Sequence, residues 1–144
     1  MQQPKQSSGE YLFVYGTLRH GAVHPLAERL RREAEYLGPG TANGRLFLLD
    51  GYPGMVGSEQ TAELVYGDLY HLSTDPVLLQ QLDAYEECAP EAPERSEFLR
   101  RPTRITTERG GLYTAWAYFY NRSTDQLLQI KSGDFFRESG QEAI

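Results

Sequence analysis

One carboxylate in this chain falls where a helix would present its apolar face. In a helix expected before residue 88, at about 100° per residue, Leu78, Leu82 and Leu79 share one arc. Glu86 falls at about 80° from Leu78, inside that arc. Burying an ionised carboxylate is costly, and burial raises its pKa toward the range of a general acid or base. Glu86 is therefore a candidate for proton transfer.

Two other interpretations of Glu86 stay open. It could follow the last ordered turn of the helix, because helix ends read from sequence err by a few residues. It could also form a structural ion pair, for which the candidate partners are Arg100, Arg101 and Arg104. The neighbouring polar residues Asp83, Glu87 and Gln80 fall together at about 140–200°, the side expected to face solvent.

A second chemical feature is the turn after the first expected strand. Residues 16–18 (Gly-Thr-Leu) directly follow a wholly apolar run. They match neither GxxxxGK[ST] nor GxGxxG, so they do not indicate a nucleotide site. Free backbone N–H groups at such a strand end could hold an anion or an amide oxygen. An ordinary turn is the alternative.

Metal and thiol chemistry are weakly supported. His20, His24 and Glu28 have the i, i+4, i+8 spacing of one helical face. A helix would most naturally begin at Pro25, however, which leaves His20 and His24 outside it, so no metal site is expected. Cys88 is the only cysteine, which excludes an internal disulfide. Its acidic neighbours raise a thiol pKa and disfavour a nucleophilic role.

Composition restricts the class of protein. The chain has 144 residues, 40% of them hydrophobic, which is enough for one domain with its own core. Its 20 acidic residues against 14 basic ones argue against nonspecific DNA or RNA binding. The polar first ten residues contain no apolar signal segment, and no run approaches the roughly 18 apolar residues of a membrane helix. We expect a cytoplasmic protein without a nucleic-acid or membrane partner; the oligomeric state is open.

The elements that must position these residues are mostly strands. Residues 1–10 are expected to form a disordered leader, 11–138 a single domain and 139–144 a frayed tail. Strands are predicted over 11–15 (buried on both faces), 41–49 (with a possible bulge at Gly44), 62–72 (interrupted at Gly67), 98–107 and 112–121. Turns are expected at 51–54 and 110–111.

Two short helices complete the expected elements. The first runs from Pro25 to a stop at Gly38-Pro39-Gly40, and the second from Asp75-Pro76 to about Glu87. Strands that outnumber helices in this way predict a mixed α+β domain. Its sheet is expected to curl into a small mixed β-barrel with short flanking helices.

Several short motifs resemble those of the γ-glutamylcyclotransferase-like family, in the family's order. They are Tyr15-Gly16-Thr17-Leu18 after the first strand, Gly-Tyr-Pro-Gly at 51–54, Leu-Asp-Ala-Tyr-Glu at 82–86 (the family's LDxxE), Phe-Leu-Arg at 98–100 and Ser-Gly-Asp-Phe at 132–135. YGTL followed by LDxxE about seventy residues later is fairly specific. The compact chain is most similar to the small γ-glutamylamine cyclotransferase-type members.

The resemblance implies a reaction and a set of roles. The substrate's α-amine attacks its own γ-carbonyl, which gives 5-oxoproline and a free amine, with no metal or organic cofactor. The acid/base is Glu86, and backbone N–H groups that hold the γ-glutamyl moiety map onto Tyr15, Gly16, Thr17 and Leu18. The further candidates for substrate contact are Tyr52, Arg100, Tyr118 and Tyr120.

Two departures and one rival interpretation accompany this resemblance. Phe98 stands where the family often has Tyr, and Glu87 where Gly is common, and both bear on substrate choice. The rival is a non-catalytic binding module for a small molecule or a protein, since a fold does not fix a function. Catalysis needs Glu86 to face a cavity near residues 16–18. A Glu86 locked to Arg100 without a cavity would favour the module. A substrate outside γ-glutamyl chemistry is also open.

Overall fold

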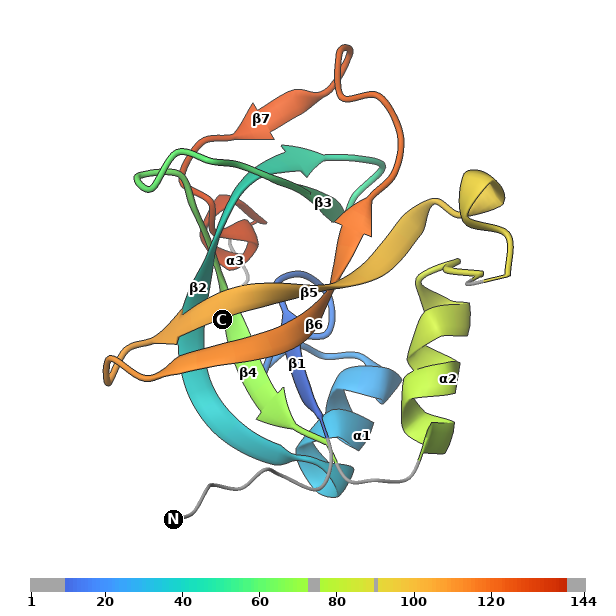
Figure 1. Cartoon of the computed structure of the whole chain (residues 1–144), viewed down its shortest axis with the longest axis vertical. Coiled ribbons are helices and arrows are strands. Elements are labelled where there is room, and N and C mark those ends of the chain that lie inside the picture. Colours follow the sequence, from blue (N-terminus) through green and yellow to red (C-terminus); the bar gives the residue numbers. More distant parts are fainter. Residues whose placement is uncertain (1–9, 73–75, 90, 140–144) are drawn as a thin grey trace.

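The computed structural model describes residues 10–72, 76–89 and 91–139, which form a curved sheet with short helices on its outside (Figure 1). The elements in chain order are β1 (Tyr11–Val14), α1 (Pro25–Glu33), β2 (Glu35–Leu48), β3 (Pro53–Gly57), β4 (Leu64–His71), α2 (Pro76–Tyr85), the 3₁₀ turn η1 (Pro93–Arg95), β5 (Phe98–Thr107), β6 (Leu112–Tyr120), β7 (Leu128–Ile130) and α3 (Phe135–Ser139). Residues 1–9 of the predicted leader (1–10), residues 140–144 of the predicted tail (139–144) and the predicted helix start at Asp75 lie outside the described residues. Ser139 is the last residue of α3.

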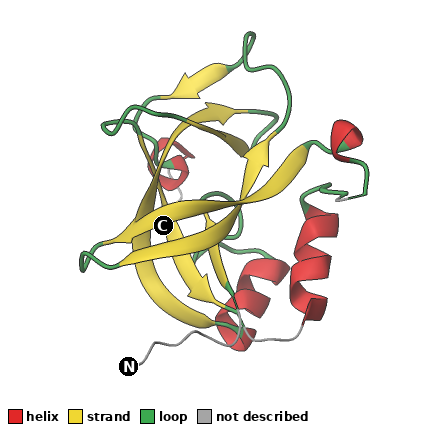
Figure 2. Cartoon of the chain, viewed as in Figure 1, coloured by secondary structure: helices red, strands yellow, loops and turns green. Residues whose placement is uncertain are grey.

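The sheet closes into a barrel. Its seven strands follow the order β1-β4-β2-β3-β6-β5, with β7 added beside β2. Parallel pairing of β1 with β6 and antiparallel pairing of β2 with β5 close the ring β1-β4-β2-β5-β6. Closure of the sheet leaves few strand edges with unpaired backbone groups. The predicted α+β mixed barrel with short flanking helices is confirmed (Figure 2).

Strand β2 is the largest departure from the prediction. The first helix ends at Glu33, and the Gly38-Pro39-Gly40 segment lies inside a strand of 14 residues instead of stopping a helix. The predicted bulge at Gly44 is also wrong: the register shifts between Tyr36 and Gly38. Gly38 has φ +112, a conformation that favours glycine, so it absorbs the irregularity where β2 bends around the barrel.

The other strand boundaries agree or differ by small amounts. Residues 98–107 form β5 as predicted, and the hairpin turn after it contains Gly110 at φ +86. The expected turn at 51–54 is shorter, because β3 already begins at Pro53. Gly67 does not interrupt β4; a Cβ there would lie 2.3 Å from the Val14 carbonyl oxygen, so glycine permits the close β1–β4 contact.

Helix α1 begins where the sequence predicts. Pro25 is its first residue, and His24 caps it, because the His24 Nδ1 accepts a hydrogen bond from the Leu26 N–H at 3.1 Å. His20 also lies outside the helix, stacked on the Tyr36 ring. Both histidines therefore have structural partners.

Two apolar clusters hold the site from opposite sides. One fills the barrel and includes Phe13. The other lies between the barrel wall and helices α1 and α2 and includes Leu12, Leu30 and Leu82. Strand β1 contributes to both, which confirms that it is buried on both faces. Burial of these side chains fixes the end of β1 against the end of α2, where the candidate site lies.

Candidate active site

The end of α2 places Glu86. The helix ends at Tyr85, two residues before the predicted end, but the Glu86 N–H still bonds to the Leu82 carbonyl at 2.9 Å. Glu87 then turns the chain with a left-handed φ of 54°, and the Cys88 N–H bonds to the Asp83 carbonyl at 2.9 Å. This is a glycine-type helix end built with a glutamate. It keeps Glu86 on the helical path, so its side chain continues the inward face.

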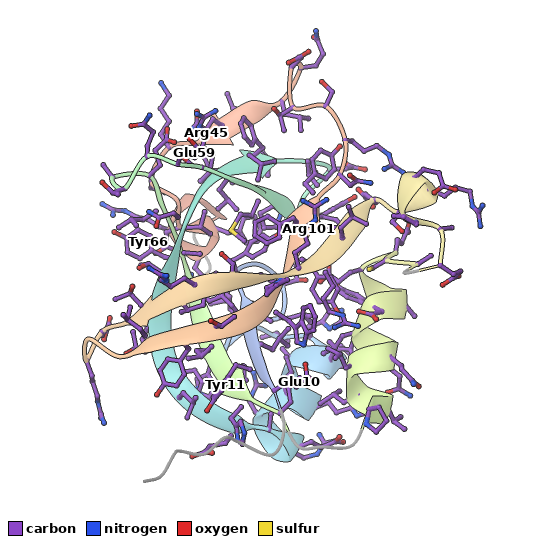
Figure 3. All side chains as sticks on the ribbon, in the orientation of Figure 1. Glu10, Tyr11, Arg45, Glu59, Tyr66 and Arg101 are labelled. Atoms are coloured by element: carbon purple, nitrogen blue, oxygen red, sulfur yellow. The ribbon has the colours of Figure 1, made fainter. Side chains whose placement is uncertain are left out.

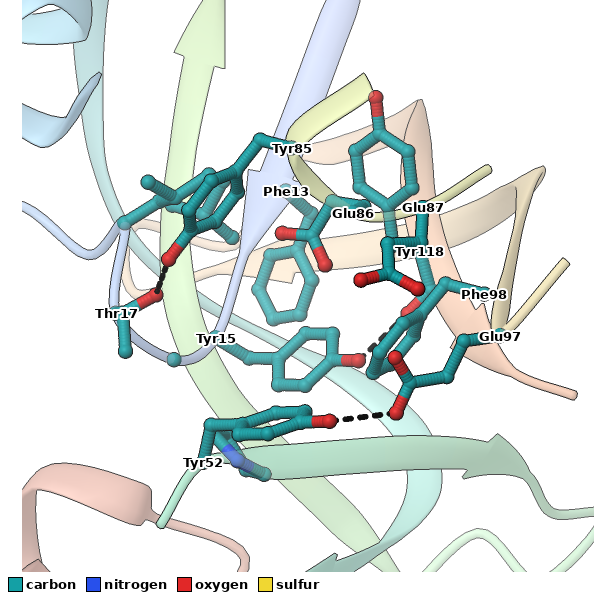
Figure 4. A pocket seen from close by; sticks show the side chains of 14 residues that line it. Phe13, Tyr15, Thr17, Tyr52, Tyr85, Glu86, Glu87, Glu97, Phe98 and Tyr118 are labelled. Carbon is teal, nitrogen blue, oxygen red and sulfur yellow. Dashed lines mark hydrogen bonds between the residues drawn. The ribbon is translucent and has the colours of Figure 1, made fainter. Parts of the chain in front are cut away.

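Glu86 faces a cavity of about 230 Å³ (Figure 4). The walls come from the end of β1 and the turn after it, the start of β3, the end of α2, the start of β5, and β6. The lining residues are Phe13, Val14, Tyr15, Gly16, Thr17, Leu18, Tyr52, Pro53, Tyr85, Glu86, Glu87, Glu97, Phe98 and Tyr118. The cavity therefore brings together the two chemical features that the sequence singled out.

Within the described residues, the Glu86 carboxylate is unpaired. No hydrogen bond or ion pair reaches it from residues 10–72, 76–89 or 91–139, and the side chain is only partly exposed. Burial, and then the charge of Glu97, raises the pKa of Glu86 from 4.5 to about 8. A carboxyl group with such a pKa both accepts and releases a proton near neutral pH.

The ion-pair interpretation of Glu86 is wrong, because Arg100 pairs with Asp83. The Arg100 Nε donates to Asp83 Oδ1 at 2.8 Å and Nη2 donates to Oδ2 at 3.1 Å. Arg101 and Arg104, the other two candidates on β5, are exposed (Figure 3 labels Arg101).

The solvent-facing prediction for Asp83 is also wrong. Asp83 is 8% exposed, and the Tyr118 hydroxyl donates to its Oδ1 at 2.6 Å. The buried face of α2 therefore includes Asp83 as well as the leucines, because residues of β5 and β6 pack beside it and supply its polar partners. A helical wheel contains no information about such partners from distant strands.

Tyr15 forms the floor beneath Glu86. Its hydroxyl donates to the Tyr118 carbonyl at 2.6 Å and accepts from the Met55 N–H at 3.1 Å, so it ties β1 to β6 and β3. Burial, together with the charge of Glu86, raises the pKa of Tyr15 well above its usual value. The phenol therefore stays protonated, and its hydrogen bonds position the walls of the cavity.

The turn at residues 16–18 lines the cavity, and Thr17 lies on the side away from Glu87 and Glu97 (Figure 4). In the part of the chain that the structure describes, no acceptor is found for the N–H groups of Gly16, Thr17 and Leu18. Gly16 and Thr17 are half-buried and Leu18 is buried. Main-chain N–H groups without a protein acceptor beside a cavity are able to hold an oxyanion or a carbonyl oxygen. Gly16 permits this path, since a Cβ there would lie 2.8 Å from the Pro53 Cγ.

An ionic cluster of Arg19, Asp68 and Asp134 fixes the position of this turn. The Arg19 Nε donates to Asp68 Oδ2 at 3.1 Å and its Nη1 donates to Asp134 Oδ1 at 2.9 Å. The His20 N–H also donates to Asp68, which is only 2% exposed. Asp134 belongs to the Ser-Gly-Asp-Phe motif at 132–135, where the chain turns with Gly133 at φ +73. Sequence analysis missed Arg19 and Asp68, although Arg19 directly follows the YGTL motif.

Most of the predicted site residues meet in the cavity, and two do not. Residues 15–18, Tyr52, Glu86 and Tyr118 line it. Arg100 is engaged by Asp83, and Tyr120 lies outside the lining set with its ring 5.6 Å from that of Phe98.

Two polar lining residues, Glu97 and Tyr85, were not among the site candidates from the sequence. Glu97 accepts from the Tyr52 hydroxyl at 2.6 Å, and the Tyr85 and Thr17 hydroxyls share a hydrogen bond of 2.9 Å. Glu97 directly precedes the strand predicted at 98–107, but nothing in the sequence showed that this strand begins beside the cavity.

The site of this small closed barrel is a cavity lined by a partly buried carboxylate and by the turn at residues 16–18. Residues 12–137 match the family model described as "Gamma-glutamyl cyclotransferase, AIG2-like". The chain belongs to this family, and the resemblance seen in the sequence motifs is confirmed. It is accordingly an enzyme of the γ-glutamyl cyclotransferase type.

Individual relatives agree with this assignment. The chain is 34% identical over 128 residues to the γ-L-glutamyl-butirosin B γ-glutamyl cyclotransferase of Niallia circulans, covering 86% of this chain and 74% of that protein. It is 35% identical over 127 residues to the γ-glutamylcyclotransferase family protein YtfP of Escherichia coli K12, covering 86% and 94%. A crystal structure of an AIG2-like protein from Mus musculus shares the fold, with a TM-score of 0.66 at 20% identity over 83% of this chain and 82% of that one.

None of the helices in residues 10–72, 76–89 and 91–139 is long and apolar enough to cross a membrane. Nor does the same part of the chain contain a group of three or more His, Cys, Asp or Glu arranged to hold a metal ion.

Proposed function

We propose that this protein converts a γ-glutamylamine or a γ-glutamyl-amino acid into 5-oxoproline and a free amine, with Glu86 as acid and base. One observation carries the proposal: an unpaired carboxyl group with a pKa of about 8 faces the same cavity as three unpaired N–H groups. The family membership supports a γ-glutamyl substrate. A cytoplasmic location stays a prediction of the sequence.

The chemistry starts with a proton transfer. Glu86 takes a proton from the substrate's α-ammonium, because only the neutral amine can attack. The amine nitrogen then forms a bond to the γ-carbonyl carbon, and the carbonyl oxygen becomes an oxyanion. The N–H groups of residues 16–18 stabilise this charge, since they need no reorganisation as it develops.

The second half returns the proton. Glu86 delivers this proton to the leaving nitrogen, the tetrahedral intermediate collapses, and the bond from the γ-carbon to that nitrogen breaks. The attacking nitrogen gives up its second proton, which the departing amine takes up, so the amine leaves as an ammonium ion and Glu86 ends as a carboxylate. The products are 5-oxoproline and the amine; no water is consumed. Each proton step needs one carboxyl group, so neither a metal nor an organic cofactor is required.

The remaining task of the protein is to hold the substrate bent. Attack within one molecule has a high effective concentration once the nitrogen lies near the carbonyl carbon. The rings of Phe13, Tyr15 and Tyr118 limit the space on the barrel side of the cavity (Figure 4). A cavity of about 230 Å³ is small enough to favour the compact, cyclisation-ready form of a γ-glutamyl group.

The test is an assay of 5-oxoproline release. The purified protein is incubated with γ-glutamyl derivatives of several amines and amino acids, and 5-oxoproline and free amine are quantified by chromatography. We expect both products in equal amounts from at least one member. A protein that binds these compounds without turning any of them over would instead be the non-catalytic binding module.

A further inference from the structure

A pair of hydroxyl groups joins the two halves of the candidate site. The Thr17 and Tyr85 hydroxyls share a hydrogen bond of 2.9 Å, although the two residues are 68 positions apart in the sequence. Thr17 is the middle residue of the turn at 16–18, and Tyr85 directly precedes Glu86. Figure 4 shows the bond on the side of the cavity away from Glu97. It therefore connects the main-chain donors to the segment that carries the acid.

Ion pairs attach each half of the site to a different part of the barrel. Arg19, the residue after the turn, pairs with Asp68 on β4. Asp83 on α2 pairs with Arg100 on β5. In the ring β1-β4-β2-β5-β6, strand β2 lies between β4 and β5. A small change in the shape of the barrel would therefore alter the distance between the turn and the acid, and the bond between the two hydroxyls spans this distance directly.

The two bonded side chains have little freedom of their own. The His24 ring packs edge to face against the Tyr85 ring, with the ring centroids 4.9 Å apart. His24 is fixed in turn, because its Nδ1 accepts the hydrogen bond that caps α1. Thr17 is β-branched and has few χ1 rotamers, so a bond to its hydroxyl also restrains the main chain at this residue.

This bond is better suited to positioning than to stabilising the fold. Tyr85 is 39% exposed and Thr17 is partly exposed, so water can replace either hydroxyl as the partner of the other. Oxyanion donors, by contrast, stabilise a transition state only when they are in place before the reaction begins. A displacement of about 1 Å in such a site can lower the rate about a hundredfold.

Resting on the proposed function, we propose that Tyr85 and Thr17 are positioning residues, whose bond holds the N–H groups of residues 16–18 at the distance from Glu86 that the reaction requires. Neither hydroxyl takes part in a proton transfer. The α-amine and the γ-carbonyl belong to one small substrate, so an acid and a donor turn that move independently cannot serve both at once. Loss of the bond should therefore lower kcat more than it raises KM, because the oxyanion exists only after the attack has begun.

The test is a double-mutant cycle on 5-oxoproline release with Tyr85→Phe and Thr17→Val. Each change removes one hydroxyl and keeps the approximate size of the side chain. We expect kcat to fall about tenfold in each single variant, with KM changed by less than about twofold. The double variant should be no slower than either single one, because both changes remove the same bond. Thr17→Ser keeps a hydroxyl and should retain most of the activity.

The matched control is Tyr66→Phe. Tyr66 is 40% exposed and lies outside the cavity lining, so this change should leave kcat as it is. The pH profile separates positioning from proton transfer: burial and Glu97 raise the pKa of Glu86, and neither hydroxyl variant changes these causes, so the profile should keep its midpoint near pH 8. An unchanged kcat in Tyr85→Phe would overturn the inference. So would losses that add up in the double variant, because they would show two independent roles.

A second measurement needs no substrate. Backbone N–H order parameters of residues 16–18, obtained from NMR relaxation, should be near the rigid value of about 0.85 in the unaltered protein and lower in Tyr85→Phe. Equal values in the two proteins would also overturn the inference. If the unaltered protein turns over no γ-glutamyl compound, the proposed function fails, and the order parameters alone decide whether the bond holds the turn.

Discussion

Two carboxylates at the end of α2 have opposite surroundings. Asp83 and Glu86 are three positions apart, and both are withdrawn from bulk solvent. Asp83 accepts two bonds from Arg100 and one from Tyr118, which satisfies its charge. Glu86 has no such partner in the part of the chain that the structure describes, and burial raises its pKa to about 8. The supply of partners, and not burial alone, separates a structural carboxylate from a reactive one.

Asp83 also supports the cavity that Glu86 faces. Asp83 holds the Tyr118 hydroxyl, and the Tyr118 carbonyl accepts the bond from the Tyr15 hydroxyl. Tyr15 and Tyr118 both line the cavity that Glu86 faces. The same helix turn thus provides a fixed wall and a free acid.

The largest expected effect is the loss of activity in Glu86→Gln. The amide has nearly the same size but cannot exchange a proton, so kcat/KM for the best substrate should fall about a thousandfold, or about 4 kcal/mol. Thermal unfolding at pH 9 should show a protein at least as stable as the original, because a buried charge has been removed. Activity within tenfold of the original would assign the proton transfers to another group.

Next in size is the loss of stability in Asp83→Asn. This substitution removes the negative charge opposite Arg100 and weakens three hydrogen bonds, so the free energy of unfolding should fall by about 2 kcal/mol. Urea unfolding measures the change. At a temperature where the variant is folded, kcat should fall far less than in Glu86→Gln. A variant as stable as the original but inactive would reverse the roles assigned to the two acids.

Local patterns in the sequence predict most elements of this fold. The β5–β6 hairpin and the start of α1 depend on nearby residues, and both were predicted correctly. Strand β2 was not, because Gly38-Pro39-Gly40 ends a helix in most contexts. Here its pairing with β4 and β5 overrides that local preference.

The candidate site shows the same division between local and distant information. Glu86 was found from its place on the helical wheel, which is a local property. The partner of Asp83 comes from β5 and that of Arg19 from β4, so neither pair follows from spacing along the chain. Recognition of a motif identified the turn at residues 16–18, but the unpaired state of its N–H groups is visible only in the structure.

The next prediction is the pH dependence of kcat/KM and of stability, and we assign it to the titration of Glu86. A base with a pKa of about 8 must be ionised to act, so kcat/KM should fall about tenfold per pH unit below pH 8 and level off above it. Stability should change in the opposite direction: a pKa raised from 4.5 favours folding at low pH, and this contribution is lost between about pH 4.5 and pH 8. In Glu86→Gln both trends should flatten, and an unchanged stability profile in that variant would contradict the burial of the charge.

The smallest expected effect is on stability and concerns Glu87. Two variants at this position separate the effect of its backbone conformation from the effect of its charge. Glu87→Gly relieves the left-handed conformation at φ 54, so the free energy of unfolding should rise by about 0.5–1 kcal/mol. Glu87→Ala is the matched control, because it removes the same charge but keeps the Cβ. If the two variants are equally stable in urea, the turn stores no backbone strain, and the cost that we assign to the glutamate disappears. If the glycine variant alone is more stable, the glutamate at position 87 lowers the stability of this chain by a measurable amount. The contrast between Asp83 and Glu86 gives a reason to keep it: a carboxylate without a protein partner is available to a ligand.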